Sequence, residues 1–276
     1  MLKIRAFTAA ILLSLFLSAL FLLPPNGWNA LCAFVLGIAA WEWAGLAALA
    51  TGGRSVYAAI VVAVLIGAII LGDLWANDLY PSIAVYYIAA LFWLILVPLW
   101  MWRRFRFDGR TPLLVAGVIA LVPAFAALIE FRSIHHPFLL LAVMGTVWIS
   151  DSTAYLIGRR FGRRKLAPAI SPGKTWEGSF GALLAVALYA LAWVHFGGIA
   201  SLPAWVGRVP AGAAWMVLVL LGLAVAGMVG DLFESLIKRQ AGVKDSGALL
   251  PGHGGLLDRI DALIPVLPLA VLAFVK

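Results

Sequence analysis

The amino-acid sequence predicts an all-α integral membrane protein, and its composition leads to that prediction. Of the 276 residues, 64% are hydrophobic and 12% are charged, whereas soluble proteins have roughly half and about a quarter, respectively. The mean hydropathy is +1.05. A soluble core cannot bury so many apolar side chains, which excludes a disordered chain, a secreted disulfide scaffold and a soluble DNA-binding domain. Although the net charge is +8, we expect no nucleic-acid partner.

Nine apolar segments approach the length of about 20 residues that a helix needs to cross the hydrocarbon core. They are 6–23, 28–50, 56–72, 83–102, 112–129, 137–157, 177–197, 211–238 and 262–275. The last is short, and we expect it to be tilted or partly interfacial. Proline and glycine turns separate many of the segments. The sequence therefore predicts one transmembrane domain over 1–276, with two long polar loops at 158–176 and 239–261.

The first segment has two interpretations. Lys3 and Arg5 precede its apolar run, and Leu17-Ser18-Ala19 imitates the cleavage site of a signal peptide. However, the run is long, and Pro24-Pro25-Asn26-Gly27 leads directly into the second segment. We favour a retained first helix. In the second segment, the single cysteine, Cys32, is expected to be a small buried hydrophobe.

The basic residues predict the orientation. If the N-terminus is cytoplasmic, the cytoplasmic segments hold all but three of the 20 Lys and Arg residues. The exceptions are Arg132, Arg208 and Lys276. Such an asymmetry follows the positive-inside rule. The basic face also fits anionic lipid headgroups, and we expect the protein in a bacterial inner membrane.

Five acidic residues fall within or at the edges of apolar segments, where a carboxylate usually faces a cavity, a partner or a metal. They are Glu42, Asp151, Glu177, Asp231 and Glu234. In the predicted topology the last four lie near the cytoplasmic boundary, so we expect a polar cavity open to the cytoplasm. Two of them have structural alternatives. Glu177 can simply favour a helix N-terminus, and Glu42 can form an interhelical pair or lie near the interface.

The segment 230–261 combines the residue types that phosphate chemistry needs. Carboxylates at 231, 245, 258 and 261 alternate with cations at 238, 239, 244 and 259, and glycines lie between them. Carboxylate oxygens hold Mg²⁺, which also bridges substrate phosphates. Lys and Arg neutralise phosphate oxygens, and glycine lets backbone N–H groups approach an anion. This mixture predicts a phosphate-binding site at the membrane boundary.

Two blocks of the sequence resemble the phosphatidate cytidylyltransferases, also called CDP-diacylglycerol synthases. The first is Ser235-x-Ile237-Lys238-Arg239-x4-Lys244-Asp245-x-Gly247-x2-Leu250-Pro251-x-His253-Gly254-Gly255-Leu256-x-Asp258-Arg259-Ile260-Asp261. The second runs from Asp151-Ser152-Thr153-Ala154-Tyr155 to Ser171-Pro172-Gly173-Lys174-Thr175-Trp176-Glu177-Gly178. The resemblance implies that CTP and phosphatidate give CDP-diacylglycerol and diphosphate. It assigns the catalytic helices and loops to 137–276, leaves 1–136 as N-terminal helices without assigned function, and implies a homodimer.

The resemblance also implies a Mg²⁺ site and a second metal ion as a further expectation. Asp231 and Asp258 match the metal-binding acids of the family. Asp261 is a weaker candidate, since it can instead pair with Arg259 or cap the last helix. Asp151 either orients a cation or ligates the second metal.

Substrate phosphates are assigned to the basic residues of both blocks. Lys238, with a catalytic role, Arg239, Lys244 and Arg259 form one set, although the positive-inside rule by itself also explains cations here. Ser171 and Lys174 form a second set. His253 either donates to a phosphate oxygen or protonates the leaving group, or it is a loop histidine with a structural partner.

Two alternatives come from different classes of protein. A related CTP-dependent enzyme acts on another lipid, such as a polyprenol or an ether lipid, and the close match of the first block argues against it. An ion-coupled transporter also carries intramembrane acids, but transporter sites lie near the bilayer midplane, often within repeats. Here the acids crowd one boundary, and the sequence has no repeat.

Overall fold

The structure is a computed structural model that describes residues 2–76, 83–106, 109–134, 137–196, 212–249 and 254–274. Its helices are α1 (Leu2–Leu22), α2 (Pro25–Leu46), α3 (Thr51–Ala76), α4 (Ile83–Leu91), the π-helical turn η1 (Phe92–Leu96), α5 (Val97–Arg103), α6 (Thr111–Ile134), α7 (Pro137–Phe161), α8 (Trp176–His195), α10 (Gly212–Gln240), α11 (Leu257–Ile260) and α12 (Leu263–Phe274). Two short strands, β1 (Lys165–Ala167) and β2 (Ser171–Thr175), complete the fold.

The helical membrane fold is confirmed. Each of the nine predicted segments contains a helix, with α4, η1 and α5 forming one continuous run. Within the described ranges, seven helices are long and apolar enough to cross a membrane. The shorter apolar helices, Ala10–Leu22 and Leu263–Phe274, stand at the two ends of the chain. The chain is therefore an integral membrane protein, whereas a count of nine membrane spans stays a prediction.

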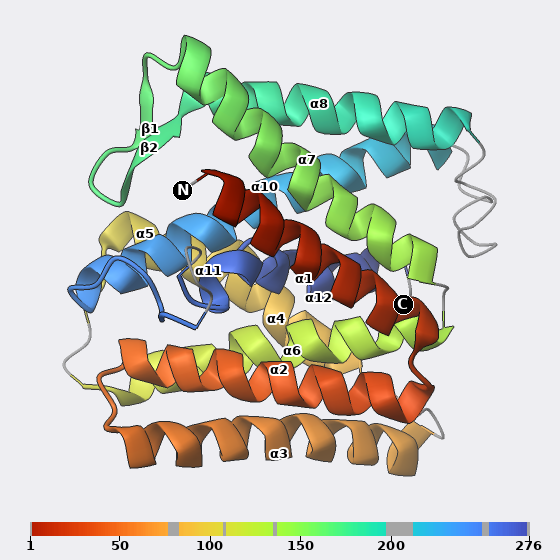
Figure 1. The fold of residues 1–276 in the computed structure, drawn as a ribbon, viewed down its shortest axis with the longest axis vertical. Helices are drawn as coiled ribbons and strands as arrows, with labels where there is room; N and C mark the ends of the chain where they lie inside the picture. Colours follow the sequence, from red (N-terminus) through yellow and green to blue (C-terminus); the bar gives the residue numbers. More distant parts are fainter. Residues whose placement is uncertain are drawn as a thin grey trace.

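The helices form a bundle in which consecutive members are largely antiparallel (Figure 1). α2 packs between α3 and α6, while α7 and α8 pack against each other and against α10. Only short turns join α1 to α2 and α2 to α3, which places these neighbours side by side. Pro25, in the first turn of α2, suits that position because the first amides of a helix have no intrahelical acceptor.

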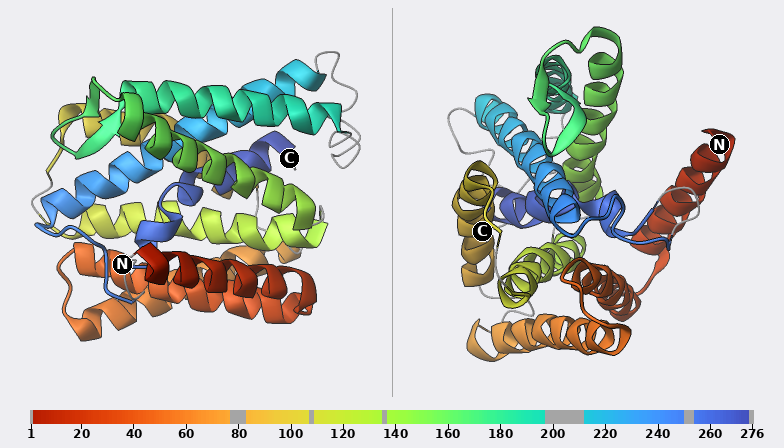
Figure 2. Two further views of the ribbon diagram at one scale, coloured as in Figure 1. Left: turned by 45° about the horizontal axis from the view of Figure 1, so that its top comes forward. Right: turned by 90° about the vertical axis from the view of Figure 1, so that its left-hand side faces the viewer.

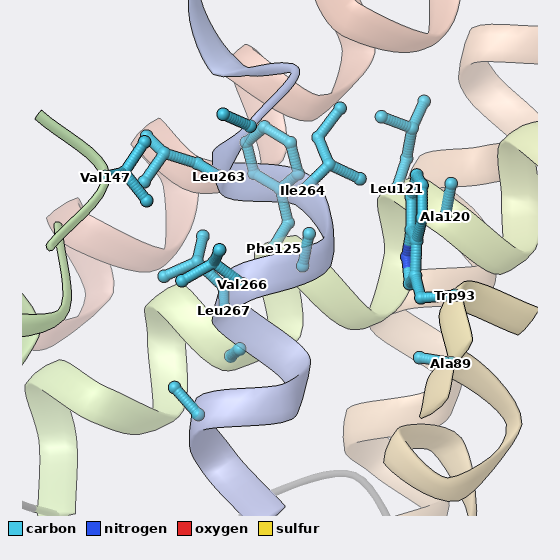
Figure 3. Packing of buried hydrophobic residues seen from close by; sticks show 14 of the residues in the cluster. Ala89, Trp93, Ala120, Leu121, Phe125, Val147, Leu263, Ile264, Val266 and Leu267 are labelled. Atoms are coloured by element: carbon cyan, nitrogen blue, oxygen red, sulfur yellow. The ribbon is translucent and has the colours of Figure 1, made fainter. Parts of the chain in front are cut away.

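α12 lies at the centre of the bundle, where it contacts α4, α6, α7 and α10. Figure 3 shows Ile264 and Leu267 of this helix packed close to Phe125 of α6. A helix that is apolar on every side is stable only when it is surrounded. α12 is therefore buried within the bundle, and a tilted or partly interfacial position of the last segment stays a prediction.

The predicted polar loop 158–176 is largely ordered secondary structure. α7 continues to Phe161, and β1 and β2 then form an antiparallel hairpin in which Lys165 pairs with Thr175. The hairpin is a small correction to an all-α fold (Figure 1). Its second strand leads directly into α8, whose first turn is capped: the hydroxyl of Thr175 accepts a hydrogen bond from the Gly178 N–H at 3.2 Å.

Candidate active site

A polar cavity of about 780 Å³ lies at one end of the bundle, between α7, the β-hairpin, α10 and the segment before α12. Most of the predicted site residues line it, namely Asp151, Ser171, Lys174, Asp231, Lys238, Asp258, Arg259 and Asp261. Two blocks that are far apart in the chain therefore meet in one place. The left view of Figure 2 shows the hairpin and the end of α10 on the same side of the bundle.

Lys238 and Asp258 form a largely buried ion pair in the cavity. The Lys238 Nζ lies 2.5 Å from Asp258 Oδ1 and 2.8 Å from Glu234 Oε2. The other oxygen of Asp258 accepts hydrogen bonds from the Ser246 N–H at 3.0 Å, the Ser246 hydroxyl at 3.0 Å and the Gly255 N–H at 2.8 Å. Burial raises the pKa of Asp258, but the hydrogen bonds and the Lys238 charge outweigh it and hold the pKa below its ordinary value. Asp258 is therefore ionised at neutral pH.

A second ion pair joins the hairpin to α10. The Lys174 Nζ of β2 lies 2.5 Å from Asp231 Oδ2, and the Ser235 hydroxyl, one turn further along α10, donates to Asp231 Oδ1 at 3.4 Å. Because β2 is part of a paired hairpin, its lysine approaches α10 from a fixed direction. Two of the carboxylates that line the cavity, Asp231 and Asp258, thus each have a lysine beside them.

Asp261 lies between α11 and α12 and faces the same group of acids. Its Oδ1 accepts a hydrogen bond from the N–H of the next residue, Ala262, at 2.8 Å. A helix-capping side chain accepts from an amide two or three residues further along, so capping of the last helix by Asp261 stays a prediction. Burial raises the pKa of Asp261 well above its ordinary value, and the carboxylates of Asp231 and Glu234 raise it further.

The hydrogen-bond partners of Glu42 could not be predicted from the sequence. Its side chain on α2 is 1% exposed, and it accepts hydrogen bonds from the Leu256 N–H at 3.0 Å, the Leu257 N–H at 2.9 Å and the Ser246 hydroxyl at 3.1 Å. The expected interhelical contact is present, since Leu257 lies on α11, but the partners of Glu42 are backbone N–H groups and a serine hydroxyl and not a charged side chain. Glu42 thereby holds the segment that carries Asp258. The partners lie more than 200 residues away in sequence, so the only available signal was a lone acid in an apolar helix.

The glycines of this segment allow that close approach. A Cβ at Gly247 would lie 2.4 Å from Glu42 Oε1, and one at Gly255 would lie 2.1 Å from the Ser246 hydroxyl and 2.6 Å from Glu42 Oε2. Only glycine fits at both positions. The glycines of this segment are predicted to bring backbone amides near an anion, and the nearby anions are Glu42 and Asp258.

Several predicted residues lie elsewhere. Arg239 and Lys244 are exposed at the end of α10 and in the segment after it, outside the cavity of the described chain. Glu177 also lies outside it, and its carboxylate accepts hydrogen bonds from the Arg164 N–H at 3.1 and 3.2 Å. Of the four acids expected near the cytoplasmic boundary, Asp151 and Asp231 line the cavity, whereas Glu177 and Glu234 do not. His253 falls outside the described residues.

The donor set fits a Mg²⁺ ion that substrate helps to bind. Within the described ranges, three or more His, Cys, Asp or Glu side chains do not form a ready metal cluster. Mg²⁺, however, is commonly held by one or two carboxylates together with waters and substrate phosphates. Asp231 and Asp258 line the same cavity. Each carboxylate has a lysine ammonium beside it, which neutralises its negative charge as a bound Mg²⁺ also would.

The fold and the cavity define a class of protein: a helical membrane protein whose carboxylate–lysine cavity suits phosphate-bearing substrates. The particular family follows from comparison with known proteins. The chain belongs to the cytidylyltransferase family, whose sequence model matches residues 3–275, and the expected family resemblance is thereby confirmed.

Two curated relatives are similar over nearly the whole chain, and a third over less than half of it. The "Phosphatidate cytidylyltransferase" of Pseudomonas aeruginosa is 39% identical over 278 residues, which cover 97% of this chain and 95% of the relative. That of Haemophilus influenzae is 33% identical over 288 residues, or 97% of this chain and 96% of the relative. The protein of the same name from Brucella abortus is 48% identical over 122 residues, covering 44% of this chain and 41% of the relative.

Proposed function

We propose that this protein is a phosphatidate cytidylyltransferase, which transfers the cytidylyl group of CTP to phosphatidate and releases diphosphate. The observation that carries the proposal is the similarity to curated enzymes of that name over 97% of the chain. The cavity supports it, since the two sequence blocks meet there between membrane-spanning helices.

The reaction needs positioning and charge neutralisation more than a strong base. A phosphate oxygen of phosphatidate attacks the α-phosphorus of CTP, and the bond to the departing diphosphate breaks. The attacking oxygen is already anionic, so the main barrier is the approach of two polyanions and the charge on the leaving group. Lys174 and Lys238 supply positive charge at fixed positions in the cavity. Arg259, which also lines it, offers a guanidinium that suits a phosphate.

Asp231 and Asp258 are the proposed metal ligands, with Asp261 a weaker one and Asp151 available to a second ion. Bound Mg²⁺ would supply Lewis-acid neutralisation of phosphate charge. The hydrogen bonds to Asp258 keep one of its oxygens turned toward Ser246 and Gly255, while its other oxygen remains with Lys238. Ionised and oriented in this way, Asp258 would offer Mg²⁺ its Oδ1, the oxygen that faces the Lys238 ammonium. His253 is kept as a candidate donor to the leaving group.

We further propose that the cavity opens to the cytoplasm of a bacterial inner membrane. The distribution of basic residues in the sequence supports this orientation. The same basic segments would attract anionic lipids, including the phosphatidate substrate. A homodimer is also expected for a member of this family.

The test is product formation by the purified full-length protein in detergent with CTP, phosphatidate and Mg²⁺. We expect CDP-diacylglycerol that requires Mg²⁺, and a loss of at least about a hundredfold for Asp258→Asn, since an oriented charge in such a site is worth several kcal/mol. Glu177→Gln is the matched control, because this carboxylate lies outside the cavity.

Each failure has a separate meaning. No product from phosphatidate would overturn the proposed reaction, and product from a polyprenol phosphate or ether-lipid phosphate in parallel assays would redirect it. Product without any divalent ion would overturn the metal assignment. Full activity of Asp258→Asn would leave the reaction intact but remove Asp258 from it.

A further inference from the structure

A second cavity, of about 380 Å³, lies between α1, α2, α6 and α12. Its lining in the described chain is apolar apart from one charged residue, Arg259. The right view of Figure 2 shows α1 diverging from the other helices toward its N-terminal end. On α1, Leu12 and Leu15 line the cavity and are 37% and 62% exposed. A hydrocarbon chain can therefore reach the cavity from the bilayer without crossing a polar surface.

Arg259 connects this apolar cavity to the polar one, because it lines both. Its neighbour Asp258 belongs to the polar cavity, and Leu256 and Ile260 belong to the apolar one. α11 therefore forms the boundary between an ionic chamber and a hydrocarbon chamber, with a guanidinium on that boundary. A diacyl lipid phosphate has the same order of parts: an anionic phosphate attached to long apolar chains.

We propose that the apolar cavity holds an acyl chain of the phospholipid substrate while its phosphate lies beside Arg259 in the polar cavity. This inference rests on the proposed function and adds the site that receives the lipid tail. The arginine fork binds phosphate oxygens through paired hydrogen bonds, which would fix the headgroup at the point where the two chambers meet.

The apolar cavity extends from α11 toward the opposite end of the bundle. Its residues on α1 and α2, such as Ala19 and Trp28, lie close to the turn that joins these helices. Glu42, which holds the catalytic segment, lies near the other end of α2. The cavity therefore runs along the helix axes, the direction that acyl chains take in a bilayer.

The far end of the cavity is closed by a fixed cluster. The indole N–H of Trp28 donates to the Leu128 carbonyl at 3.2 Å, and the ring meets Phe16 edge-on at a centroid distance of 6.0 Å. The Arg132 guanidinium lies 5.4 Å from the Trp28 ring and donates to the Leu20 carbonyl at 2.9 Å. These contacts hold the end of α1 against the bundle, so the cavity has a defined length.

A site of this kind controls position more than affinity. Lipid tails are as apolar as the leucines that line the cavity, so moving a chain from the bilayer into it gains little free energy. Filling the cavity should therefore displace long chains by steric conflict and spare lipids whose chains are too short to enter it. The expected signature is a loss of activity that depends on acyl-chain length.

The experiment compares Ala19→Trp with Ser18→Trp in the full-length protein. Ala19 lines the cavity, and Ser18 is the adjacent exposed residue outside it. Both variants and the wild type are assayed with dipalmitoyl-phosphatidate and dihexanoyl-phosphatidate in the same detergent. We expect Ala19→Trp to lower kcat/KM at least about tenfold for the long-chain lipid, because the indole ring would take the space that the bound acyl chain occupies. Its activity on the short-chain lipid, and both activities of Ser18→Trp, should change less than about twofold on the same scale.

Equal effects of Ala19→Trp on both lipids, or no effect on either, would overturn the acyl-chain site while leaving the reaction in place. A wild-type protein inactive on both lipids would instead overturn the proposed function. A second measurement on the wild type does not depend on the variant's folding: phosphatidate with a photoreactive group at the chain end is cross-linked and mapped. Labels on the cavity residues of α1, α2 or α6 support the site, and labels confined to α3 or α8 overturn it.

Discussion

At the scale of single residues, the balance of charge in the cavity depends on Lys238. Its ammonium group contacts Asp258 and Glu234 at 2.5 and 2.8 Å, and all three side chains are shielded from solvent. Removing one partner from a buried ionic group is strongly destabilising, because the remaining charges lose their compensation. Lys238 therefore has a structural and a catalytic role in the same position.

We expect Lys238→Met to reduce activity by about a hundredfold or more, since removing one preorganised donor from a reacting site costs about 10²–10³ in kcat. The measurement is the rate of CDP-diacylglycerol formation at saturating Mg²⁺. Lys244→Met is the comparison, because Lys244 is exposed and outside the cavity, and we expect it to lose much less. An equal loss in both variants would support the single phosphate-binding set predicted from the sequence.

Glu42 is a positioning residue whose effect reaches the reaction through Asp258. Glu42→Gln keeps the shape, but its amide has only one oxygen, so either the Leu256 N–H or the Leu257 N–H would face an N–H₂ group and lose its acceptor. Since unsatisfied buried donors cost about 1–3 kcal/mol, we expect a tenfold to hundredfold fall in kcat, by that same estimate, with KM for CTP nearly unchanged. A change in KM for CTP with kcat unchanged would contradict the positioning role. So would Glu42→Asp if it recovered none of the kcat lost in Glu42→Gln.

At the scale of elements, the segment between α10 and α12 depends on a close fit and not on regular secondary structure. The Gly255 N–H donates a hydrogen bond to Asp258, and the side chains of Glu42 and Ser246 occupy the space that a Cβ at Gly255 would need. The hairpin performs the matching task on the other side of the cavity, where it delivers Lys174 to Asp231. Both elements convert irregular loop sequence into fixed geometry.

Gly255→Ala tests that fit. Its Cβ would lie 2.1 Å from the Ser246 hydroxyl, so we expect the loop to shift and activity to fall about tenfold or more, as overpacking costs of 1–3 kcal/mol imply. Gly222→Ala is the matched control, since its Cβ would meet nothing within 4 Å and alanine favours a helix. Activity and thermal stability are measured for both. A harmless Gly255→Ala would show that the loop tolerates a different path.

At the scale of the whole molecule, the two ends of the bundle differ in chemistry. The polar cavity lies at the end where α2 finishes and α3 begins, whereas the α1–α2 turn carries the Arg132–Trp28 cluster. The distribution of basic residues in the sequence predicts that the first of these ends faces the cytoplasm.

Cysteine labelling in intact spheroplasts tests this orientation. We expect Asn26→Cys, in the first turn of α2, to react with a membrane-impermeant maleimide, and Gly52→Cys, at the start of α3, to react only after permeabilisation. Both positions are exposed, whereas the native Cys32 is buried, so the background should be small. The reverse labelling pattern would invert the proposed topology and place the cavity outside the cytoplasm.

The sequence by itself determined the membrane class, the positions of the helices and the family. Hydrophobicity and turn residues act over neighbouring positions, so they could be read locally. The helical period also distinguishes Lys238 from Arg239, because consecutive residues on a helix cannot face the same way. Of these two residues, only Lys238 lines the cavity.

Only the tertiary structure decided which charges meet. It pairs Lys174 with Asp231 and places Glu42 against the backbone of Leu257, 215 residues away. It also turns the predicted loop 158–176 into a hairpin and buries α12 at the centre of the bundle. No local pattern encodes such partners, because their proximity arises from the packing of whole helices, and helix packing joins segments without regard to their separation in the chain.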